Sequence, residues 1–242
     1  MLQLKHVQIA IGDKIIIPDF SYTFEKGKVY AIMGPNGSGK SSLASAIMGN
    51  PAYSVKAEEM SIAAIGSSER VNLIDLAPEK RAEAGVFMSF QSPIALSGIR
   101  AAQLIQHALK GKKSALAIRR EVESAGAALH IPKELLDRSL NEGSSGGERK
   151  KMEVLQAAIL DKPLQIFDEI DTGVDVDAMK CIAQFLEENK KDKTYIVITH
   201  YNRILKYLKP DKVLILLNGK LALSGDHTLA QKIENEGYKF VE

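Results

Sequence analysis

The chain has 242 residues, which is long enough for one large domain or two closely packed lobes with a substantial core. Its 45% hydrophobic and 26% charged residues are typical of a soluble globular protein. The formal net charge of only +2 argues against a global electrostatic attraction to nucleic acid. No apolar run approaches the length of a membrane span and the N-terminus carries no secretory signal, so we expect a cytoplasmic protein.

The first part of the chain predicts strands. Residues 4–9 alternate apolar and polar side chains, and an apolar run at 15–17 follows a short turn, which indicates two strands. Residues 22–24 and 29–31 flank another hairpin-like signal. Loops with short strands are expected over 54–76. These patterns together predict an antiparallel β layer at the N-terminus.

The middle of the chain changes to helical patterns. Residues 78–84 begin with proline and are followed by glycine, which are usual signals for the two ends of a helix. Residues 86–90 form an apolar run that predicts a core strand. Between 93 and 160 the apolar spacing is helical and alanine is frequent. We expect this segment to be a helical subdomain inserted into a catalytic core made of 1–92 and 161–242.

Apolar strands return in the last third, at 164–167, 195–199 and 213–217, and a helical pattern over 177–190 lies between the first two. This alternation favours a parallel sheet covered by helices. The pair Asn218-Gly219 predicts a hairpin after the last of these strands. The expected fold class is therefore α/β, with a mostly parallel sheet, an N-terminal antiparallel β layer and an inserted helical subdomain.

Residues 34–41 match the phosphate-binding loop pattern G-x-x-x-x-G-K-[ST] without a mismatch. A buried strand is predicted before the loop and a helix after it, which is the context in which such a loop binds phosphate. Lys40 would reach the β- and γ-phosphates, and the Ser41 hydroxyl would hold Mg²⁺. The residues expected to bind the nucleotide here are Gly34, Pro35, Asn36, Gly37, Ser38, Gly39, Lys40, Ser41 and Ser42.

Two carboxylates stand at the end of the predicted strand 164–167. Asp168 would bind Mg²⁺, and Glu169 could polarise the attacking water as a general base. The two residues could instead be acidic surface residues that end a strand. The complete phosphate loop upstream favours the catalytic interpretation.

Ser145-Gly146-Gly147-Glu148 precedes a helical pattern over 149–158, which makes it a candidate anion site at a helix N-terminus. Taken alone, it could also be a flexible helix cap. The segment resembles the signature loop of the ABC ATPases, and Gln91, Asp175 and His200 fall at their Q-loop, D-loop and switch histidine. The resemblance implies that Gln91 senses Mg²⁺ and the γ-phosphate. It also implies that His200 acts on the γ-phosphate and that the signature residues and Asp175 bind nucleotide.

The ABC resemblance further implies a head-to-tail dimer with ATP and Mg²⁺ as cofactors. Each ATP would lie between the phosphate loop of one subunit and the Ser145–Gly147 loop of the other. Because the γ-phosphate is neutralised from both sides, ATP would hold the dimer together and hydrolysis would weaken it. The monomer should then be a poor ATPase. Ile11 departs from the pattern, since most ABC ATPases stack adenine on an aromatic residue at this position.

Residues 140–151, 168–178 and 76–82 resemble the SufC family, in which Glu ends the signature and basic residues follow. This resemblance implies an ATPase that drives the SufB and SufD scaffold proteins during iron–sulfur cluster assembly. The single cysteine, Cys181, agrees with a motor role, because one thiol cannot hold a cluster by several thiolates. Ser92 departs from the aromatic residue usual after the Q-loop glutamine, so we expect partner binding to differ there.

Two alternatives remain open. The chain could be the nucleotide-binding subunit of an ABC membrane transporter, with its Q-loop and helical surfaces fitted to a permease. It could also be a regulatory module that binds ATP without hydrolysing it. The intact set Lys40, Asp168, Glu169 and His200 argues against the regulatory alternative.

Overall fold

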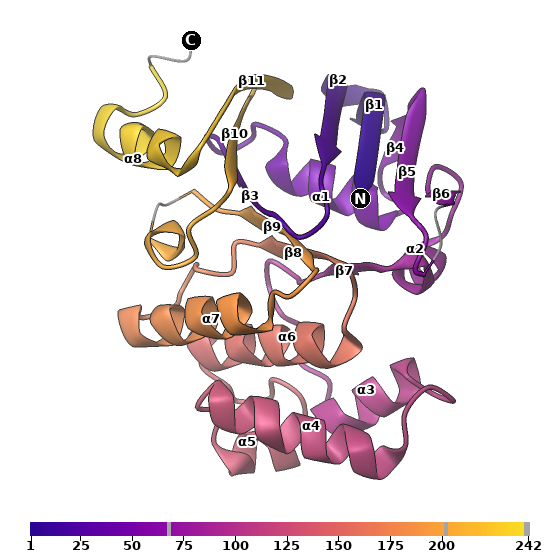
Figure 1. The fold of residues 1–242 in the computed structure, drawn as a ribbon, viewed down its shortest axis with the longest axis vertical. Coiled ribbons are helices and arrows are strands. Elements are labelled where there is room, and N and C mark those ends of the chain that lie inside the picture. Colours follow the sequence, from indigo (N-terminus) through magenta and orange to yellow (C-terminus); the bar gives the residue numbers. More distant parts are fainter. Residues whose placement is uncertain (67–68, 201–202, 240–242) are drawn as a thin grey trace. The chain divides into compact units, whose positions relative to one another are not determined.

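The computed structural model describes residues 1–66, 69–200 and 203–239, which form two compact units (Figure 1). The first unit comprises Met1–Met88, Lys162–Glu169 and Lys190–Glu242, and the second comprises Ser89–Asp161 and Ile170–Asn189. Each is described here by itself. The expected helical segment falls inside the second unit, which also contains residues 170–189. The boundaries of the catalytic core stay a prediction.

An antiparallel sheet forms the N-terminal layer of the first unit (Figure 1). Its strand order is β2–β1–β5–β6, and β4 also pairs with β1. The strands are β1 (Leu2–Ile11), β2 (Lys14–Phe24), β4 (Ser54–Lys56), β5 (Glu59–Ala63) and β6 (Arg70–Asn72). The predicted antiparallel layer is confirmed, and β2 joins into one strand the two short runs predicted at 15–17 and 22–24.

A second, mostly parallel sheet of the first unit has the order β11–β10–β3–β9–β8–β7. All neighbours are parallel except β10 and β11, the predicted hairpin pair. The strands are β3 (Val29–Met33), β7 (Val86–Met88), β8 (Leu164–Asp168), β9 (Thr194–Ile198), β10 (Lys212–Leu217) and β11 (Lys220–Gly225). The hairpin expected between residues 22–24 and 29–31 is wrong. Strand β3 is buried at every position and pairs with β10 and β9, so it leaves no edge for β2.

The core of the first unit lies around helix α1 (Lys40–Met48). Leu43 and Ile47 of this helix are fully buried in one cluster with apolar residues of both sheets. Helix α1 contacts β1 of the antiparallel sheet and β7 and β8 of the parallel sheet. The remaining helical elements of this unit are α2 (Pro78–Ala84), a 3₁₀ turn (Ile204–Lys206) and α8 (His227–Glu236). The helix that follows the phosphate loop is thus held by both sheets at once.

The second unit is built from helices (Figure 1). They are α3 (Ala101–Ala108), α4 (Ala115–Ala128), α5 (Lys133–Asp137), α6 (Gly146–Leu160) and α7 (Val176–Asn189). Helix α4 contacts α3, α5 and α6, and α6 also contacts α7. Helix α6 begins earlier than the predicted Arg149, because a capping box formed by Ser145 and Glu148 brings both signature glycines into the helix.

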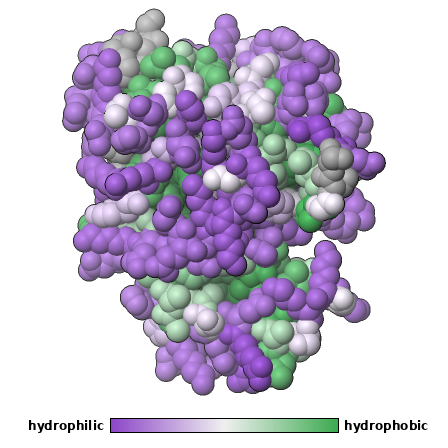
Figure 2. Space-filling view, viewed as in Figure 1, coloured by the Kyte–Doolittle hydropathy of each residue, from purple (hydrophilic) through white to green (hydrophobic). Residues whose placement is uncertain are grey.

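Hydrophilic side chains cover most of the molecular face drawn in Figure 2. Large apolar side chains are concentrated in the buried cores instead, with scattered exceptions such as Ile15 and Leu116. Within residues 1–66, 69–200 and 203–239, no helix combines the length and apolarity needed to cross a membrane.

Arg81 of α2 closes the C-terminal end of α1. Its guanidinium is buried, and Nη1 donates to the carbonyl oxygens of Ala46 (2.6 Å) and Ile47 (3.0 Å). Nε and Nη2 donate to the carbonyls of Leu76 and Ile74, so the same side chain ties the segment before α2 to the end of α1. The last carbonyls of a helix have no partners within the helix, and a positive charge there is favourable. Burial lowers the pKa of Arg81.

We expect Arg81→Met to lower the free energy of unfolding by about 3 kcal/mol, because the buried carbonyl oxygens of Ala46 and Ile47 would each lose a charged donor. Urea denaturation followed by circular dichroism would measure this change. Lys80→Met is the matched control, since Lys80 lies on the same helix in an exposed ion pair with Glu83. Its loss should leave the free energy of unfolding nearly unchanged, because an exposed ion pair contributes little. Equal effects of the two substitutions would contradict the capping role of Arg81.

Candidate functional site

Helix α1 begins at Lys40 with no side chain capping its N-terminus. The N-cap residue, Gly39, makes no side-chain hydrogen bond, and the first turn contains no acidic residue. The first N–H groups of a helix lack partners within the helix and carry a positive partial charge. They follow the C-terminal end of the parallel strand β3, and this geometry is the one expected of the predicted phosphate loop.

The course of the loop depends on Gly34, which has a φ of +157°. A Cβ atom at this position would lie 2.2 Å from the carbonyl oxygen of Leu216 and 2.7 Å from Oγ of Ser38. Lys40 closes the loop, because its Nζ donates to the carbonyl oxygens of Gly34 (2.8 Å) and Pro35 (3.0 Å). The ammonium group is therefore directed into the loop that surrounds it.

Lys40 is 4% exposed, and burial lowers its pKa to about 8 against the opposing attraction of Glu169 and Asp168. Its two acceptors in the loop are neutral carbonyls. Burial thus disfavours the charged ammonium, and a nearby anion such as a phosphate oxygen would favour it again.

The two carboxylates predicted after strand β8 lie beside the phosphate loop. Ser41 Oγ donates to Asp168 Oδ1 over 3.1 Å. Glu169 follows with a φ of 50°, in a region that residues other than glycine adopt rarely. Its Oε1 lies 2.6 Å from Nε2 of His200, whose Nδ1 lies 3.2 Å from the carbonyl oxygen of Gly34. Loop, carboxylates and histidine thus meet in the first unit.

The two contacts of His200 indicate how many protons the imidazole ring and the Glu169 carboxyl group must hold between them. A carbonyl oxygen can only accept, so Nδ1 must donate to Gly34. A bond between Nε2 and Glu169 then needs a further proton, on the ring or on the carboxyl group. The oxygen of Glu169 that would serve as a base is therefore already engaged in this structure.

The predicted signature residues lie in the second unit, at the start of α6. The backbone N–H of Ser145 donates to Glu148 Oε2 (2.7 Å), and the N–H of Glu148 donates to Ser145 Oγ (3.3 Å). Unlike α1, this helix is capped by its own side chains. A Cβ atom on Gly146 would lie 2.9 Å from the carbonyl oxygen of Gly173, so the signature loop packs closely on the predicted D-loop.

Asp175 caps the next helix of the second unit, because its Oδ1 accepts from the N–H of Ala178 over 2.8 Å at the start of α7. This hydrogen bond lowers the pKa of the Asp175 carboxyl group. Gln91, Ser145–Gly147, Glu148 and Asp175 all belong to the second unit. Their roles toward a nucleotide bound by the first unit stay predictions.

Ile11 lies at the end of β1 in the first unit and is 44% exposed.

Arg81 and Glu153 are two buried charged residues that the sequence patterns did not identify. A signal for Glu153 exists, since it stands between Met152 and Val154 in an apolar run. Arg81 has none, because its buried partners, the carbonyls of Ala46 and Ile47, lie on a distant part of the chain.

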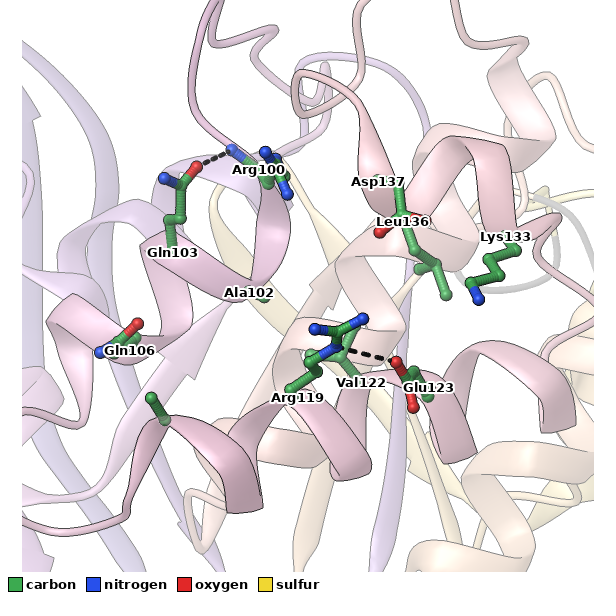
Figure 3. A pocket seen from close by; sticks show the side chains of 11 residues that line it. Arg100, Ala102, Gln103, Gln106, Arg119, Val122, Glu123, Lys133, Leu136 and Asp137 are labelled. Atoms are coloured by element: carbon green, nitrogen blue, oxygen red, sulfur yellow. Dashed lines mark hydrogen bonds and ion pairs between the residues drawn. The ribbon is translucent and has the colours of Figure 1, made fainter.

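A separate cavity of about 230 Å³ lies among α3, α4 and α5 of the second unit (Figure 3). Figure 3 shows the side chains of Arg100, Arg119 and Lys133 around it, and Arg119 is paired with Glu123 over 3.0 Å. None of the residues predicted to bind nucleotide lines this cavity. It is therefore distinct from the candidate nucleotide site.

Known proteins match this chain over nearly its whole length. Residues 17–172 match the family described as ABC transporter. An Escherichia coli protein named as the ATP-dependent transporter SufC is 38% identical over 247 residues, which cover 98% of this chain and 97% of that one. A Pyropia yezoensis protein, ycf16, is 35% identical over 100% of this chain and 97% of its own. A Streptococcus pyogenes ABC transporter ATP-binding protein is 38% identical over 98% and 93%.

Solved structures share the fold. A dimeric bacterial ABC transporter cassette has a TM-score of 0.77 at 19% identity and covers 94% of this chain and 99% of that one. A dimeric cassette in a post-hydrolysis state with ADP and phosphate has a TM-score of 0.76 at 18% identity, with the same coverage. The chain belongs to the ABC transporter family and has the ABC ATPase fold. Its full-length relatives make it an ATPase of the SufC type.

We expect Lys40→Ala to weaken Mg-ATP binding by about 100-fold or more, because the phosphates lose a buried, charge-assisted donor. Calorimetric titration of ATP into the purified variant would measure the affinity. Lys26→Ala serves as the control, since Lys26 forms an exposed ion pair with Asp192. Unchanged affinity in Lys40→Ala would show that the loop does not bind the phosphates.

Proposed function

We propose that this chain hydrolyses ATP with Mg²⁺ in the cytoplasm and thereby drives conformational change in the SufB and SufD scaffold during iron–sulfur cluster assembly. The observation that carries the proposal is the cluster of Lys40, Ser41, Asp168, Glu169 and His200 in the first unit. The SufC-type relatives support the choice of partners.

The oxygen atoms of Ser41 and Asp168 suit a Mg²⁺ ion. A hydroxyl and a carboxylate are hard donors of the kind this ion prefers, and they lie 3.1 Å apart. Gln91 would add a third oxygen ligand. When bound, Mg²⁺ would supply neutralising charge to the β- and γ-phosphates. Lys40 and the N-terminal N–H groups of α1 would hold the same phosphates from the protein side.

Glu169 would accept a proton from the attacking water. Its Oε1 lies 2.6 Å from Nε2 of His200, a contact that would hold such a base in a resting arrangement. We propose that the γ-phosphate draws His200 away and frees the carboxylate. The Ser145–Gly147 loop of a second copy would bind the same phosphate in an ATP-dependent head-to-tail dimer, with Glu148 and Asp175 beside it. Basal turnover of the isolated chain should then be low.

We expect Glu169→Gln to bind ATP with near-normal affinity but to turn it over about 100-fold more slowly, because an amide cannot accept the proton. The ATP-bound dimer should then accumulate, which size-exclusion chromatography with ATP and Mg²⁺ would detect. Glu187→Gln, an exposed acidic residue of α7, is the control and should behave as wild type. A monomeric and fully active Glu169→Gln variant would remove Glu169 from the role of base.

The nucleotide-binding subunit of an ABC membrane transporter is the second candidate function. The names of the Streptococcus pyogenes relatives favour it. In the part of the chain that the structure describes, no helix has the length and apolarity of a membrane span.

Purified SufB and SufD distinguish the two functions. We expect a stable complex with this chain on gel filtration and several-fold faster ATP hydrolysis, because partner binding would bring two phosphate loops and two signature loops together. Lys40→Ala should form the complex without hydrolysis. Absence of a complex, together with co-purification of a multi-span permease from membranes, would favour the transporter function instead.

A further inference from the structure

Two charged side chains of helix α6 are buried in this protein. Lys150 is 3% exposed and Glu153 is 6% exposed. They are three residues apart, so they lie on one face of the helix about one turn from each other. Burial raises the pKa of Glu153 to about 7, because loss of water disfavours the charged carboxylate. Apolar residues would fill the same space at less cost, which indicates that these two serve a purpose besides packing.

Both side chains hold the backbone of the Q-loop. The N–H of Phe90 donates to Glu153 Oε2 over 2.8 Å. Lys150 Nζ donates to the carbonyl oxygen of Gln91 over 2.8 Å and to that of Phe90 over 3.3 Å. One turn of α6 thus accepts a hydrogen bond from a backbone N–H of this segment and donates hydrogen bonds to two of its carbonyl oxygens. We call the three hydrogen bonds made by Lys150 and Glu153 the Q-loop clamp.

The side chains of the clamped segment are largely exposed to solvent. Phe90 is 54% exposed, and Gln91 and Ser92 are exposed as well. The backbone contacts to α6 therefore hold the segment more than apolar packing does. The same helix begins at Gly146 in the signature loop, only about 6 Å along its axis from Lys150.

We propose that Lys150 and Glu153 are positioning residues that fix the Q-loop glutamine, Gln91, on the helix that carries the signature loop, so that the two elements move together. This inference rests on the proposed function, in which both elements act on ATP. A scaffold protein that displaces the exposed residues Phe90 to Ser92 would then move the signature loop as well. Binding of a scaffold protein to this segment would thereby change the rate of ATP turnover.

A nitroxide label at position 92 tests the clamp without nucleotide. Ser92→Cys in a Cys181→Ser background gives one site for the label in the full chain. We expect the electron paramagnetic resonance lines to sharpen in Glu153→Met and Lys150→Met, because the segment loses its anchors. Glu153→Gln keeps an oxygen that can accept from Phe90 and should restore the wild-type spectrum.

Gln156→Met is the matched control for the loss of a buried polar group. Gln156 lies one turn further along α6, is buried, and donates to the carbonyl oxygen of Met152 in its own helix. This substitution should leave the label spectrum unchanged. If the two methionine variants of the clamp do not fold, as judged by circular dichroism, Glu153→Asp replaces them. Its carboxylate is one methylene shorter and falls short of Phe90.

The same variants without the label are then compared in ATP turnover with purified SufB and SufD. We expect kcat to fall about tenfold in Glu153→Met while KM for ATP stays within about twofold, because the phosphate loop is intact. Glu153→Gln should recover kcat.

An unchanged label spectrum in both methionine variants would overturn the clamp. A mobile label with unchanged kcat would overturn the positioning role. Wild-type protein that neither binds nor hydrolyses Mg-ATP would contradict the proposed function instead, and the label spectra would still decide the clamp.

Discussion

Helix α1 must present an N-terminus without any capping side chain, and the first unit is built around this requirement. Uncapped N–H groups are unfavourable unless an anion or water satisfies them, so the helix needs support elsewhere. Apolar contacts with both sheets supply it along the length of the helix. Arg81 supplies it at the C-terminal end, where the guanidinium binds the last carbonyls. At the other end Gly34 brings the loop within contact of Leu216.

The charged groups near the start of this helix differ in the partners that they have within the chain. Lys40 is desolvated and bound to neutral carbonyls, so phosphate can replace the lost water without breaking an ion pair. Asp168 is joined to a hydroxyl, a pair that a hard cation can bind. Glu169 Oε1 is in hydrogen-bond contact with Nε2 of His200. Each group therefore has a hydrogen-bond partner within the chain, and the proposed function would give each of them a different partner when ATP binds.

The second unit differs from the first in how its helices begin. Side chains cap the N-termini of α6 and α7, whereas no side chain caps α1. The side chains of Ser145 and Glu148 each accept a hydrogen bond from the other residue's backbone N–H. The side chain of Asp175 accepts from the backbone N–H of Ala178 at the start of α7. Burial of Lys150 and Glu153 further along α6 ties a surface-exposed loop to the signature helix. The same short stretch of helix thus caps its own N-terminus and holds the backbone of Phe90 and Gln91.

The sequence by itself determined what depends on neighbouring residues: the phosphate loop with its strand and helix, the glycine that ends α2, the hairpin at Asn218-Gly219 and the two carboxylates after β8. These features follow from local backbone geometry and apolar periodicity. Only the tertiary structure decided that β3 pairs within the parallel sheet and not with β2. It also decided that His200 contacts Glu169. It also decided that Arg81 and Glu153 are buried against segments 34 or more residues away. Pairing and burial of this kind depend on which distant backbone groups are left without partners, and no local pattern records that.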